Sequence, residues 1–502
     1  MTKYLMGIDP GTSGVKCIII DDKGKVVRSA TKTYPLYTPK PAWSEQDPAD
    51  WWNGTKEAVK EVLSDFDADK ICAIGFSGQM HGLVALDKDD KVIRPAILWN
   101  DQRTEAECSE IIETAGGIDG LVSYTNNNML PGFTGGKLLW VKKNEPENYA
   151  KIVKFFMPKD YIRFCLSGKK ATDVSDASGT GFFDVEHRCW SYELIDKLGF
   201  DRSIFPEVFE SDEVTSYVSE EAAEETGLVA GTRIYGGGGD AVIQNAGMAI
   251  VKEGTLGIVM GTSGVVGTSL GSFGKNEGGK LQFFCNNAKD KWMAFGCQLS
   301  CAGSMEWFKN TFYGDLEKPF DAINKEAEES SVGANGVQFL PYLTGERCPY
   351  SDPAARGVFY GMSLLTKRGD FARAVMEGVV FGLKQMVDLI QNTNPGLEFK
   401  EVILSGGATH SALWKQIVAD ITGLPVKTLK GAAEGGAYGG AIVAGVGEQI
   451  WDKLENVDIY EIDEVIDPIP ENVEQYKEIM KIYEKLYFDL KETFDMSAKL
   501  QG

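Results

Sequence analysis

Two short turns of the chain consist of the same five residues in the same order, and both could bind phosphate. Gly11-Thr12-Ser13-Gly14-Val15 is repeated as Gly261-Thr262-Ser263-Gly264-Val265. Such turns offer backbone N–H groups and hydroxyl donors, which are the groups that hold phosphate oxygens. One copy alone would be interpreted as a tight hairpin, whereas the repetition favours two turns that grip a polyphosphate from both sides. The candidate phosphate-binding residues are Gly11, Thr12, Ser13, Gly261, Thr262 and Ser263.

A carboxylate stands directly before the first of these turns. Asp9 ends an apolar run at the point where the glycine turn begins. There it could hold Mg²⁺ next to phosphates, through the water shell of the ion. An aspartate that only stabilises the turn is the alternative, and taken alone it is the commoner case. A Walker-type loop, G-x-x-x-x-G-K-[ST], occurs nowhere in the sequence.

Asp240 is the strongest candidate for a catalytic base. It follows four consecutive glycines, Gly236 to Gly239, and precedes a helix expected at 241–249. Four glycines would let a substrate approach the backbone closely. Transfer of a phosphoryl group to a hydroxyl needs one carboxylate to accept the proton and little other covalent chemistry. Alternatively Asp240 is the N-cap of the helix, a role that is compatible with catalysis.

A polar loop follows the strand expected at 71–76. Gln79, Met80 and His81 in this loop offer hydrogen bonds and an apolar wall, which would suit a small polyol. A loop histidine is more often structural than functional, so both interpretations stay open. Three tryptophans could form a stacking surface for a sugar or belong to the core. They are Trp43, Trp51 and Trp52.

The elements that must position these residues alternate between strands and helices. Apolar, β-branched runs at 4–8, 15–20 and from Val26, separated by turns, predict an antiparallel meander. The periodicity of apolar residues separates the remaining segments into strands and helices. Strands are expected at 71–76, 233–235, 256–260 and 402–404, and further helices at 413–421 and 474–494. The fold class is therefore α/β with mixed sheets.

The repeated turn also predicts the domain organisation. Its two copies lie about half a chain length apart, which indicates an internal duplication at the scale of a domain. With 502 residues, the chain also exceeds what one hydrophobic core usually spans. We therefore expect two lobes, residues 1–247 and 248–502, that face each other across a ligand cleft.

The composition of the chain indicates which binding partners and which cellular compartment are favoured. The formal net charge of −22 disfavours nucleic acid and anionic membranes as partners. The nine cysteines form no C-x-x-C pair, which is typical of free thiols in a reducing cytoplasm. The N-terminal residues lack the apolar region of a signal peptide, and no apolar run reaches about 18 residues. We expect a cytoplasmic protein, and a homodimer stays open.

Several segments besides the repeated turns have specific sequences. They are 7–16, 43–48, 78–82, 95–101, 132–140, 357–377 and 406–408. Together they resemble the FGGY family of carbohydrate kinases over nearly the whole chain. Residues 7–16 resemble the first phosphate loop of that family, and 132–140 and 357–377 resemble its two signatures. Residues 261–263 and 406–408 resemble the second phosphate loop and the adenosine loop.

This resemblance implies a fold and a reaction. The fold would be two actin-like, ribonuclease H-like lobes, a sugar-binding lobe (1–247) and a nucleotide-binding lobe (248–502). The reaction would be the ATP-dependent phosphorylation of a ketopentose, D-xylulose to D-xylulose 5-phosphate, with Mg²⁺. Asp240 would be the base and Asp9 the carboxylate associated with Mg²⁺. Gln79, Met80 and His81 would bind the sugar, and the two turns with Gly406 and Gly407 would bind ATP.

Departures from the family pattern keep other substrates open. Ala241 stands where members that act on D-xylulose usually have asparagine, which removes a hydrogen bond to the sugar. Ala302, Cys348 and Tyr350 are further departures, at positions near the nucleotide and in the 343–350 loop. Kinases for D-ribulose, L-xylulose or a similar polyol are the nearest alternatives. An actin- or chaperone-like ATPase and a sugar sensor are more distant ones, which an intact Asp240 disfavours.

Overall fold

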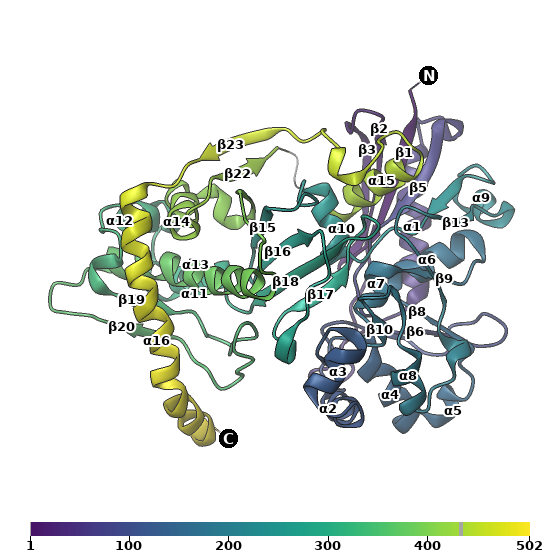
Figure 1. Ribbon diagram of the computed structural model, residues 1–502. Coiled ribbons are helices and arrows are strands. Elements are labelled where there is room, and N and C mark those ends of the chain that lie inside the picture. The colour runs from purple at the N-terminus through teal and green to yellow at the C-terminus, as the bar shows by residue number, and fades with distance from the viewer. Residues whose placement is uncertain (1, 431–434, 502) are drawn as a thin grey trace. The chain divides into compact units, whose positions relative to one another are not determined.

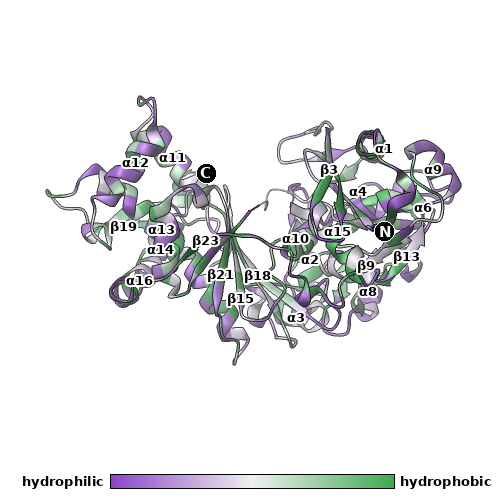
Figure 2. Cartoon of the chain, turned by 90° about the horizontal axis from the view of Figure 1, so that it is seen from above, coloured by the Kyte–Doolittle hydropathy of each residue, from purple (hydrophilic) through white to green (hydrophobic). Residues whose placement is uncertain are grey.

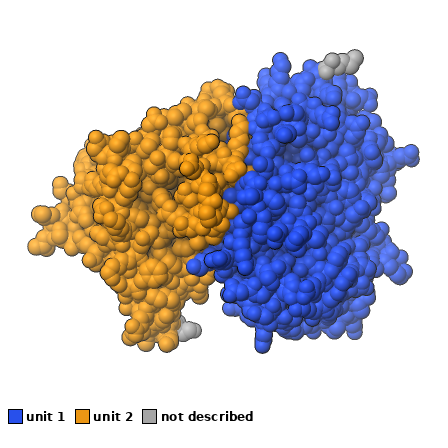
Figure 3. Space-filling model, in the orientation of Figure 1, with its two compact units in different colours: residues 1–251, 270–293, 432–459 blue, residues 252–269, 294–431, 460–502 orange. Residues whose placement is uncertain are grey.

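The computed structural model describes residues 2–430 and 435–501. The chain forms two compact units, which Figure 3 shows in blue and orange. The first comprises residues 1–251, 270–293 and 432–459, and the second comprises residues 252–269, 294–431 and 460–502. Each unit therefore collects segments from distant parts of the sequence. The lobe boundary between residues 247 and 248 stays a prediction.

The first unit is built on a six-stranded mixed sheet that begins with the expected meander. Strands β1 (Tyr4–Pro10), β2 (Gly14–Asp21) and β3 (Val26–Thr33) pair antiparallel in succession. Apolar residues on both faces of β1 and β2 are fully buried, among them Leu5, Ile8 and Ile18. The β-branched residues of these strands suit a pleated sheet. The meander predicted from the first 30 residues is confirmed.

The other half of this sheet brings in strands from later in the chain. β5 (Ile71–Phe76) lies parallel to β1, β14 (Arg233–Tyr235) lies parallel to β5, and β13 (Val214–Tyr217) closes the edge antiparallel. The spatial order is β13-β14-β5-β1-β2-β3. Because β1, β5 and β14 are parallel, their carboxyl ends lie at one edge of the sheet. That edge carries Asp9, the 77–82 loop and the four glycines before Asp240.

Helices and short strands complete the first unit. Helix α1 (Pro48–Leu63) packs on β2 and β3, and α10 (Asp240–Gly247) follows β14. The other helices are α2 (Glu105–Thr114), α3 (Ile118–Thr125), α4 (Thr134–Asn144), α5 (Pro146–Tyr149), α6 (Pro158–Ser167), α7 (Val174–Ser178), α8 (Tyr192–Lys197) and α9 (Glu220–Thr226). The short strands are β4 (Glu45–Gln46), β6 (Val84–Leu86), β7 (Ala96–Ile97), β8 (Lys154–Phe156), β9 (Ala171–Asp173), β10 (Phe183–Asp184), β11 (Cys189–Trp190), β12 (Glu207–Phe209) and β17 (Gln282–Cys285).

A helix from late in the chain packs on this early sheet. Figure 1 shows α15 (Gly435–Gly447), in yellow-green, beside the purple strands β1 and β5. The contact is close because both sides are glycine-rich. A Cβ at Gly7 would lie 1.9 Å from the carbonyl oxygen of Ala437, and a Cβ at Gly75 would lie 1.9 Å from that of Gly440. Larger residues would force the helix away from the sheet.

The sheet of the second unit repeats the topology of the first. β15 (Thr255–Met260) pairs antiparallel with β16 (Gly264–Leu270), and β18 (Trp292–Gln298) follows β16 in the sheet. On its other side, β15 is parallel to β21 (Glu401–Gly406), and β21 is parallel to β22 (Val426–Leu429). β23 (Ile462–Ile466) then pairs antiparallel. Six strands of this seven-stranded sheet, β18-β16-β15-β21-β22-β23, thus correspond in order to β3-β2-β1-β5-β14-β13, which confirms the predicted duplication.

Helices flank this second sheet. They are α11 (Ala302–Phe312), α12 (Pro319–Glu328), α13 (Arg368–Thr393), α14 (Ala412–Thr422) and α16 (Pro470–Gln501), and β19 (Gln338–Leu340) pairs with β20 (Val358–Tyr360). The helices expected at 413–421 and 474–494 are confirmed. Figure 2 shows purple, hydrophilic residues along much of α16. Among the residues that the structure describes, no helix is long and apolar enough to cross a membrane.

Candidate functional site

The first glycine turn is held by side chains from three other segments. The Tyr34 hydroxyl donates to Gly11 O at 2.5 Å, and Gln46 Nε2 donates to Thr12 O at 2.8 Å. The Trp99 indole nitrogen donates to Thr12 Oγ1 at 2.9 Å. The backbone of the turn is closed by a hydrogen bond from Gly11 N to Gly14 O at 3.0 Å. These contacts fix the direction of the backbone N–H groups.

The buried side chain of Gln79 supports this turn through hydrogen bonds. Its side chain is only 1% exposed, and Nε2 donates to Gly11 O at 3.3 Å and to Gln46 Oε1 at 3.0 Å. Its Oε1 accepts the Thr12 hydroxyl at 3.3 Å. Both ends of the amide are therefore engaged by the phosphate turn. The prediction that Gln79 binds the sugar remains a prediction, and its geometry favours a supporting role.

Asp9 has the character of a cation ligand. Its Oδ1 is buried and has no hydrogen-bond partner among residues 2–430 and 435–501, which leaves a carboxylate oxygen that a cation could use. Burial raises the pKa of Asp9, while the Ser77 side chain and Lys16 lower it. Within residues 2–430 and 435–501, no group of three or more His, Cys, Asp or Glu side chains could hold a metal. Water and phosphate oxygens could supply further ligands to a metal held at Asp9.

The four glycines before Asp240 pack closely against other parts of the protein, which leaves no room for larger side chains. The segment runs beside the 76–78 segment, with hydrogen bonds from Gly238 N to Phe76 O and from Asp240 N to Gly78 O, both at 2.9 Å. A Cβ at Gly237 would lie 2.3 Å from Phe76 O, and the φ angle of this residue is 68°. A Cβ at Gly239 would lie 2.5 Å from the Met80 Sδ atom. Close packing against the neighbouring strand and loop therefore explains these glycines.

Asp240 begins helix α10 but is not its N-cap. The N-cap is Gly239, and Asp240 is the first helical residue. Its Oδ1 accepts the N–H of Ala241 at 2.7 Å, so the predicted cap is wrong by one position. The side chain is half-buried. Burial, with a smaller contribution from the negative charge of Asp9, raises the pKa of Asp240 to about 7. The hydrogen bond from the Ala241 N–H acts in the opposite direction and lowers this pKa.

Met80 lies beside this aspartate, and His81 follows Met80 in the 77–82 loop. Met80 is 3% exposed and packs against Gly239. His81 Nδ1 lies 2.7 Å from Gly179 O, and since a carbonyl only accepts, Nδ1 carries the proton. In the neutral ring Nε2 is then the acceptor, which is the form that receives a hydroxyl hydrogen. The ring stacks on Phe133, with centroids 4.7 Å apart.

The three tryptophans do not form a common stacking surface. Trp51 is fully buried and donates to Gln46 Oε1 at 3.0 Å, and Trp52 donates to Glu225 at 3.2 Å. The Arg103 guanidinium covers the ring of Trp43 at 3.6 Å. Each of the three thus contacts other side chains of the protein. The tryptophan that sequence reasoning missed is Trp99, which contacts Thr12 and is 47% exposed.

The second glycine turn is held differently. Its loop closes from Gly261 N to Ser263 O at 3.0 Å. The first residues of α11 donate backbone N–H groups to it, from Ala302 to Gly261 O at 2.8 Å and from Cys301 to Thr262 O at 2.9 Å. The turn is not helical, as the duplication required.

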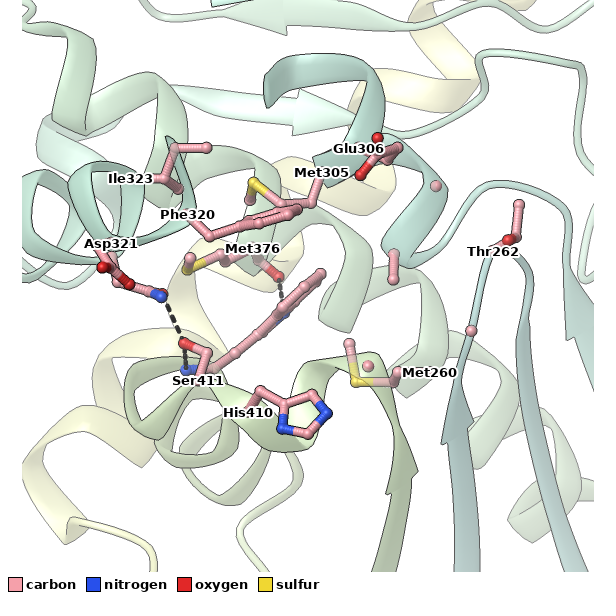
Figure 4. A pocket seen from close by; sticks show the side chains of 16 residues that line it. Met260, Thr262, Met305, Glu306, Phe320, Asp321, Ile323, Met376, His410 and Ser411 are labelled. Atoms are coloured by element: carbon pink, nitrogen blue, oxygen red, sulfur yellow. Dashed lines mark hydrogen bonds between the residues drawn. The ribbon is translucent and has the colours of Figure 1, made fainter. Parts of the chain in front are cut away.

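A cavity of about 760 Å³ opens beside this second turn, within the second unit. Figure 4 shows Thr262 and Glu306 on one side of it and Phe320 and Met305 on another, with Ser411 and His410 below. Gly261 and Gly407 also line it. A Cβ at Gly407 would meet nothing within 4 Å, so the protein leaves room there. Cavities of this size and apolar character commonly bind small molecules.

Polar groups in this cavity come from two helices and from the loop before α14. Ser411 Oγ donates to Asn324 Oδ1 at 2.7 Å and accepts the Trp414 N–H at 3.2 Å. The Trp414 indole donates to Met376 O at 3.1 Å. Sequence reasoning missed Asn324, Ser411 and Trp414, because they are spread over about 90 residues and form no motif.

The predicted site residues thus fall into two groups. Asp9, the 11–13 turn, residues 79–81 and Asp240 belong to the first unit, and the structure brings Asp9, Met80 and the turn into the surroundings of Asp240. The 261–263 turn, Gly406 and Gly407 belong to the second unit, beside the cavity. That one ATP contacts both groups stays a prediction.

Comparison with known proteins decides what these groups belong to. The N-terminal domain model of the FGGY family of carbohydrate kinases matches residues 4–247, and its C-terminal domain model matches residues 256–448. The chain belongs to the FGGY family of carbohydrate kinases. It is therefore an enzyme that transfers phosphate from ATP to an alcohol group of a carbohydrate.

Individual relatives agree over almost the full length. The chain is 37% identical to a xylulose kinase of Bacillus subtilis over 494 residues, 98% of either chain. A solved ligand-bound xylulose kinase of Lactobacillus acidophilus matches with a TM-score of 0.92 at 27% identity, covering 98% of this chain and 99% of that one. A gluconate kinase of the same organism matches with a TM-score of 0.91 at 27% identity, covering 99% and 100%. The two-domain fold of the actin-like ATPases is thereby confirmed.

Proposed function

We propose that the enzyme phosphorylates D-xylulose to D-xylulose 5-phosphate, with ATP as donor and ADP as product. The observation that carries this proposal is the 37% identity, over nearly the full length, to a protein named xylulose kinase. The site chemistry supports an uncharged substrate, because the Asp240 carboxylate, which follows Gly239 beside Met80, also lies close enough to Asp9 to feel its negative charge. An anionic sugar acid such as gluconate would be repelled there.

In this proposal Asp240 is the general base. A hydroxyl oxygen of the sugar attacks the γ-phosphorus of ATP, the bond from that phosphorus to the ADP oxygen breaks, and the hydroxyl proton passes to Asp240. Since Oδ1 accepts the Ala241 N–H, Oδ2 receives the proton. A pKa near 7 lies close to neutral pH, and a general base works best when its pKa is near the operating pH. His81 would accept a second sugar hydroxyl through Nε2.

Mg²⁺ fits the residues at the first turn. The buried Oδ1 of Asp9 has no partner among the described residues, and carboxylate oxygens and phosphates are the ligands that Mg²⁺ takes. Asp9 would hold the ion, directly or through water. When bound, the ion neutralises charge on the phosphates. The hydroxyl and N–H groups of the 11–13 turn orient those phosphates.

The 261–263 turn with Gly406 and Gly407 would bind the nucleotide, and the cavity beside them would take the adenosine. Gly407→Ala tests this assignment, because the added methyl group enters open space in the free protein. We expect unchanged thermal stability and an increase in the KM for ATP. An unchanged KM would remove Gly407 from the nucleotide site.

A panel of sugars in a coupled ADP-release assay tests the substrate. D-xylulose, D-ribulose, L-xylulose and gluconate are the informative members. Ala241 cannot donate to a sugar hydroxyl, and Asn245 cannot replace it, since its amide nitrogen donates to Ala241 O at 3.0 Å and to Val242 O at 2.9 Å. We therefore expect kcat/KM for D-xylulose to exceed that for D-ribulose by less than about 100-fold, unless Gln244 supplies the contact. A higher kcat/KM for gluconate than for D-xylulose would overturn the proposal.

Three further points complete the proposal. The first unit would bind the sugar and the second the nucleotide, with the lobes assigned to residues 1–247 and 248–502. The enzyme would work in the cytoplasm, which suits its nine free cysteines, and fractionation of cells tests this. A homodimer would be detected by light scattering.

A further inference from the structure

The sugar-binding dipeptide Met80-His81 has a strained backbone. The Gly82 N–H donates to Met80 O at 2.9 Å, which closes a three-residue turn around His81. His81 has a φ angle of 67° there. A γ-turn with positive φ at its centre is rare and strained, and the left-handed region is unfavourable for residues with a Cβ. Such a conformation persists only where surrounding groups determine it.

A buried lysine holds this turn. Lys137 Nζ donates to His81 O at 2.7 Å and to Gly132 O at 2.7 Å. The Thr134 hydroxyl donates to the same His81 oxygen at 3.2 Å. The side chain of Lys137 is fully buried in helix α4. Phe133, on which the His81 ring stacks, is the N-cap residue of α4 and lies four residues before Lys137.

Burying this lysine is unfavourable for the fold alone. Burial, with a smaller contribution from the positive charge of Arg103, lowers the pKa of Lys137 to about 7. Asp101 and Cys108 oppose this shift. An apolar side chain of similar length would avoid the desolvation of an amine. The hydrogen bonds of Lys137 end on two backbone carbonyls, one of which belongs to a residue proposed to contact the substrate. This points to a role in the site.

We infer that Lys137 is a positioning residue for the sugar: it fixes the carbonyl of His81, and so aims the His81 imidazole at a substrate hydroxyl without touching the sugar itself. The inference rests on the proposed role of His81. It assigns the buried lysine to sugar binding and leaves ATP binding independent of it.

The direct test replaces Lys137 by methionine, which keeps the length of the side chain. We expect kcat/KM for the sugar to fall by about 10–100-fold, chiefly through KM, while the KM for ATP changes less than twofold. Lys142→Met is the matched control. Lys142 lies on the same helix and also donates to two carbonyls, of Leu198 at 3.1 Å and Gly199 at 2.7 Å, and we expect near-normal kinetics.

A double-mutant cycle separates positioning from general support of the fold. If Lys137 acts through His81, its loss in a His81→Ala background should change kcat/KM for the sugar by less than about threefold. Independent effects that multiply would overturn the inference. So would a Lys137→Met variant whose KM values for sugar and ATP rise together.

Two outcomes keep the inference distinct from the proposed function. A normal KM for the sugar in His81→Ala would overturn the sugar site, and the role of Lys137 with it. An impaired His81→Ala beside a normal Lys137→Met would overturn only the role of Lys137. Should Lys137→Met fail to fold, Thr134→Val removes the other donor to the same carbonyl, and we expect a smaller rise in the same KM. No rise would count against the inference.

Discussion

The two glycine turns have the same five residues, but the protein holds them in different ways. In the first, Pro10 is opposite Val15, whereas in the second Met260 is opposite Gly264, so the second loop is one residue shorter. Side chains support the first turn, and backbone N–H groups at the start of α11 support the second. The conformation of each turn is therefore determined by its neighbours as well as by its sequence.

The residues before the turns also differ. Asp9 stands two positions before Gly11, and Val259 stands two positions before Gly261. At this position, two residues before the turn, only the first copy has a carboxylate. After duplication, one copy retained or acquired groups that suit chemistry, and the other is joined to an apolar cavity that suits binding. Four experiments test this division.

The largest effect is expected from Asp240→Asn, beside the first turn. Loss of the base should lower kcat by about 10²–10⁴-fold with little change in either KM. Asp463→Asn, at an exposed acidic residue of the second unit, is the control and should change kcat by less than threefold. Circular dichroism verifies folding. Near-normal kcat in a folded Asp240→Asn variant would refute the assignment of chemistry to the first unit.

The pH dependence should report the same base. Burial and Asp9 raise the pKa of Asp240 to about 7, so the carboxylate is ionised above this pH and protonated below it. As only the ionised form accepts a proton, kcat/KM for the sugar should fall about tenfold per unit as the pH drops below 7. The residual activity of Asp240→Asn should lack this acid limb. A flat profile from about pH 5.5 to 8 would argue against Asp240.

Equivalent glycines in the two hairpins should differ in their tolerance of alanine. A Cβ at Gly14 would lie 2.4 Å from Lys32 O, whereas a Cβ at Gly264 would first meet Leu383 Cδ2 at 2.8 Å. Side chains can move where a paired strand cannot. Gly14→Ala should lower the free energy of unfolding by about 1–3 kcal/mol, and Gly264→Ala by less. Denaturant unfolding of both variants measures the difference, and equal losses would contradict it.

The smallest effect is expected from replacing Gln79, whose side chain supports the first turn. Gln79→Leu removes the amide beneath the first turn, and each lost hydrogen bond contributes about 0.5–1.5 kcal/mol. We expect the KM for ATP to rise about 2–10-fold while the KM for the sugar stays near normal. The exposed Gln102→Leu is the control. A rise confined to the KM for the sugar would instead place Gln79 in the sugar site.

Much of the fold follows from periodicity and turns. The strands at 71–76 and 233–235 were predictable to the residue, because apolar runs there are bounded by turns. The composition of each unit was not predictable. Helix α15 (Gly435–Gly447) reads as a glycine-rich segment, and its partner strands lie more than 350 residues away. Only the packed structure reveals that its glycines match those of β1 and β5.

The site was predictable where short motifs carry it. Asp9, Met80, His81 and Asp240 stand in such motifs, and the structure brings Asp9 and Met80 close to Asp240. Lys137 also stands in such a motif, the 132–140 segment that resembles a family signature. A lysine is ordinarily exposed, however, so its burial beneath His81 could not be inferred from the sequence. The pKa of Asp240 likewise depends on burial and on Asp9, which lies 231 residues earlier in the chain.

Helix α15 has a consequence for synthesis of the chain. It covers β1 and β5 with glycine-to-carbonyl contacts too close for other residues to replace. While the ribosome translates residues 252–434, these early strands lack the helix that completes their layer. The first unit therefore cannot reach its native state until about residue 447 has emerged from the exit tunnel. Until then the nascent chain exposes an apolar sheet face, which is the kind of surface that chaperones recognise.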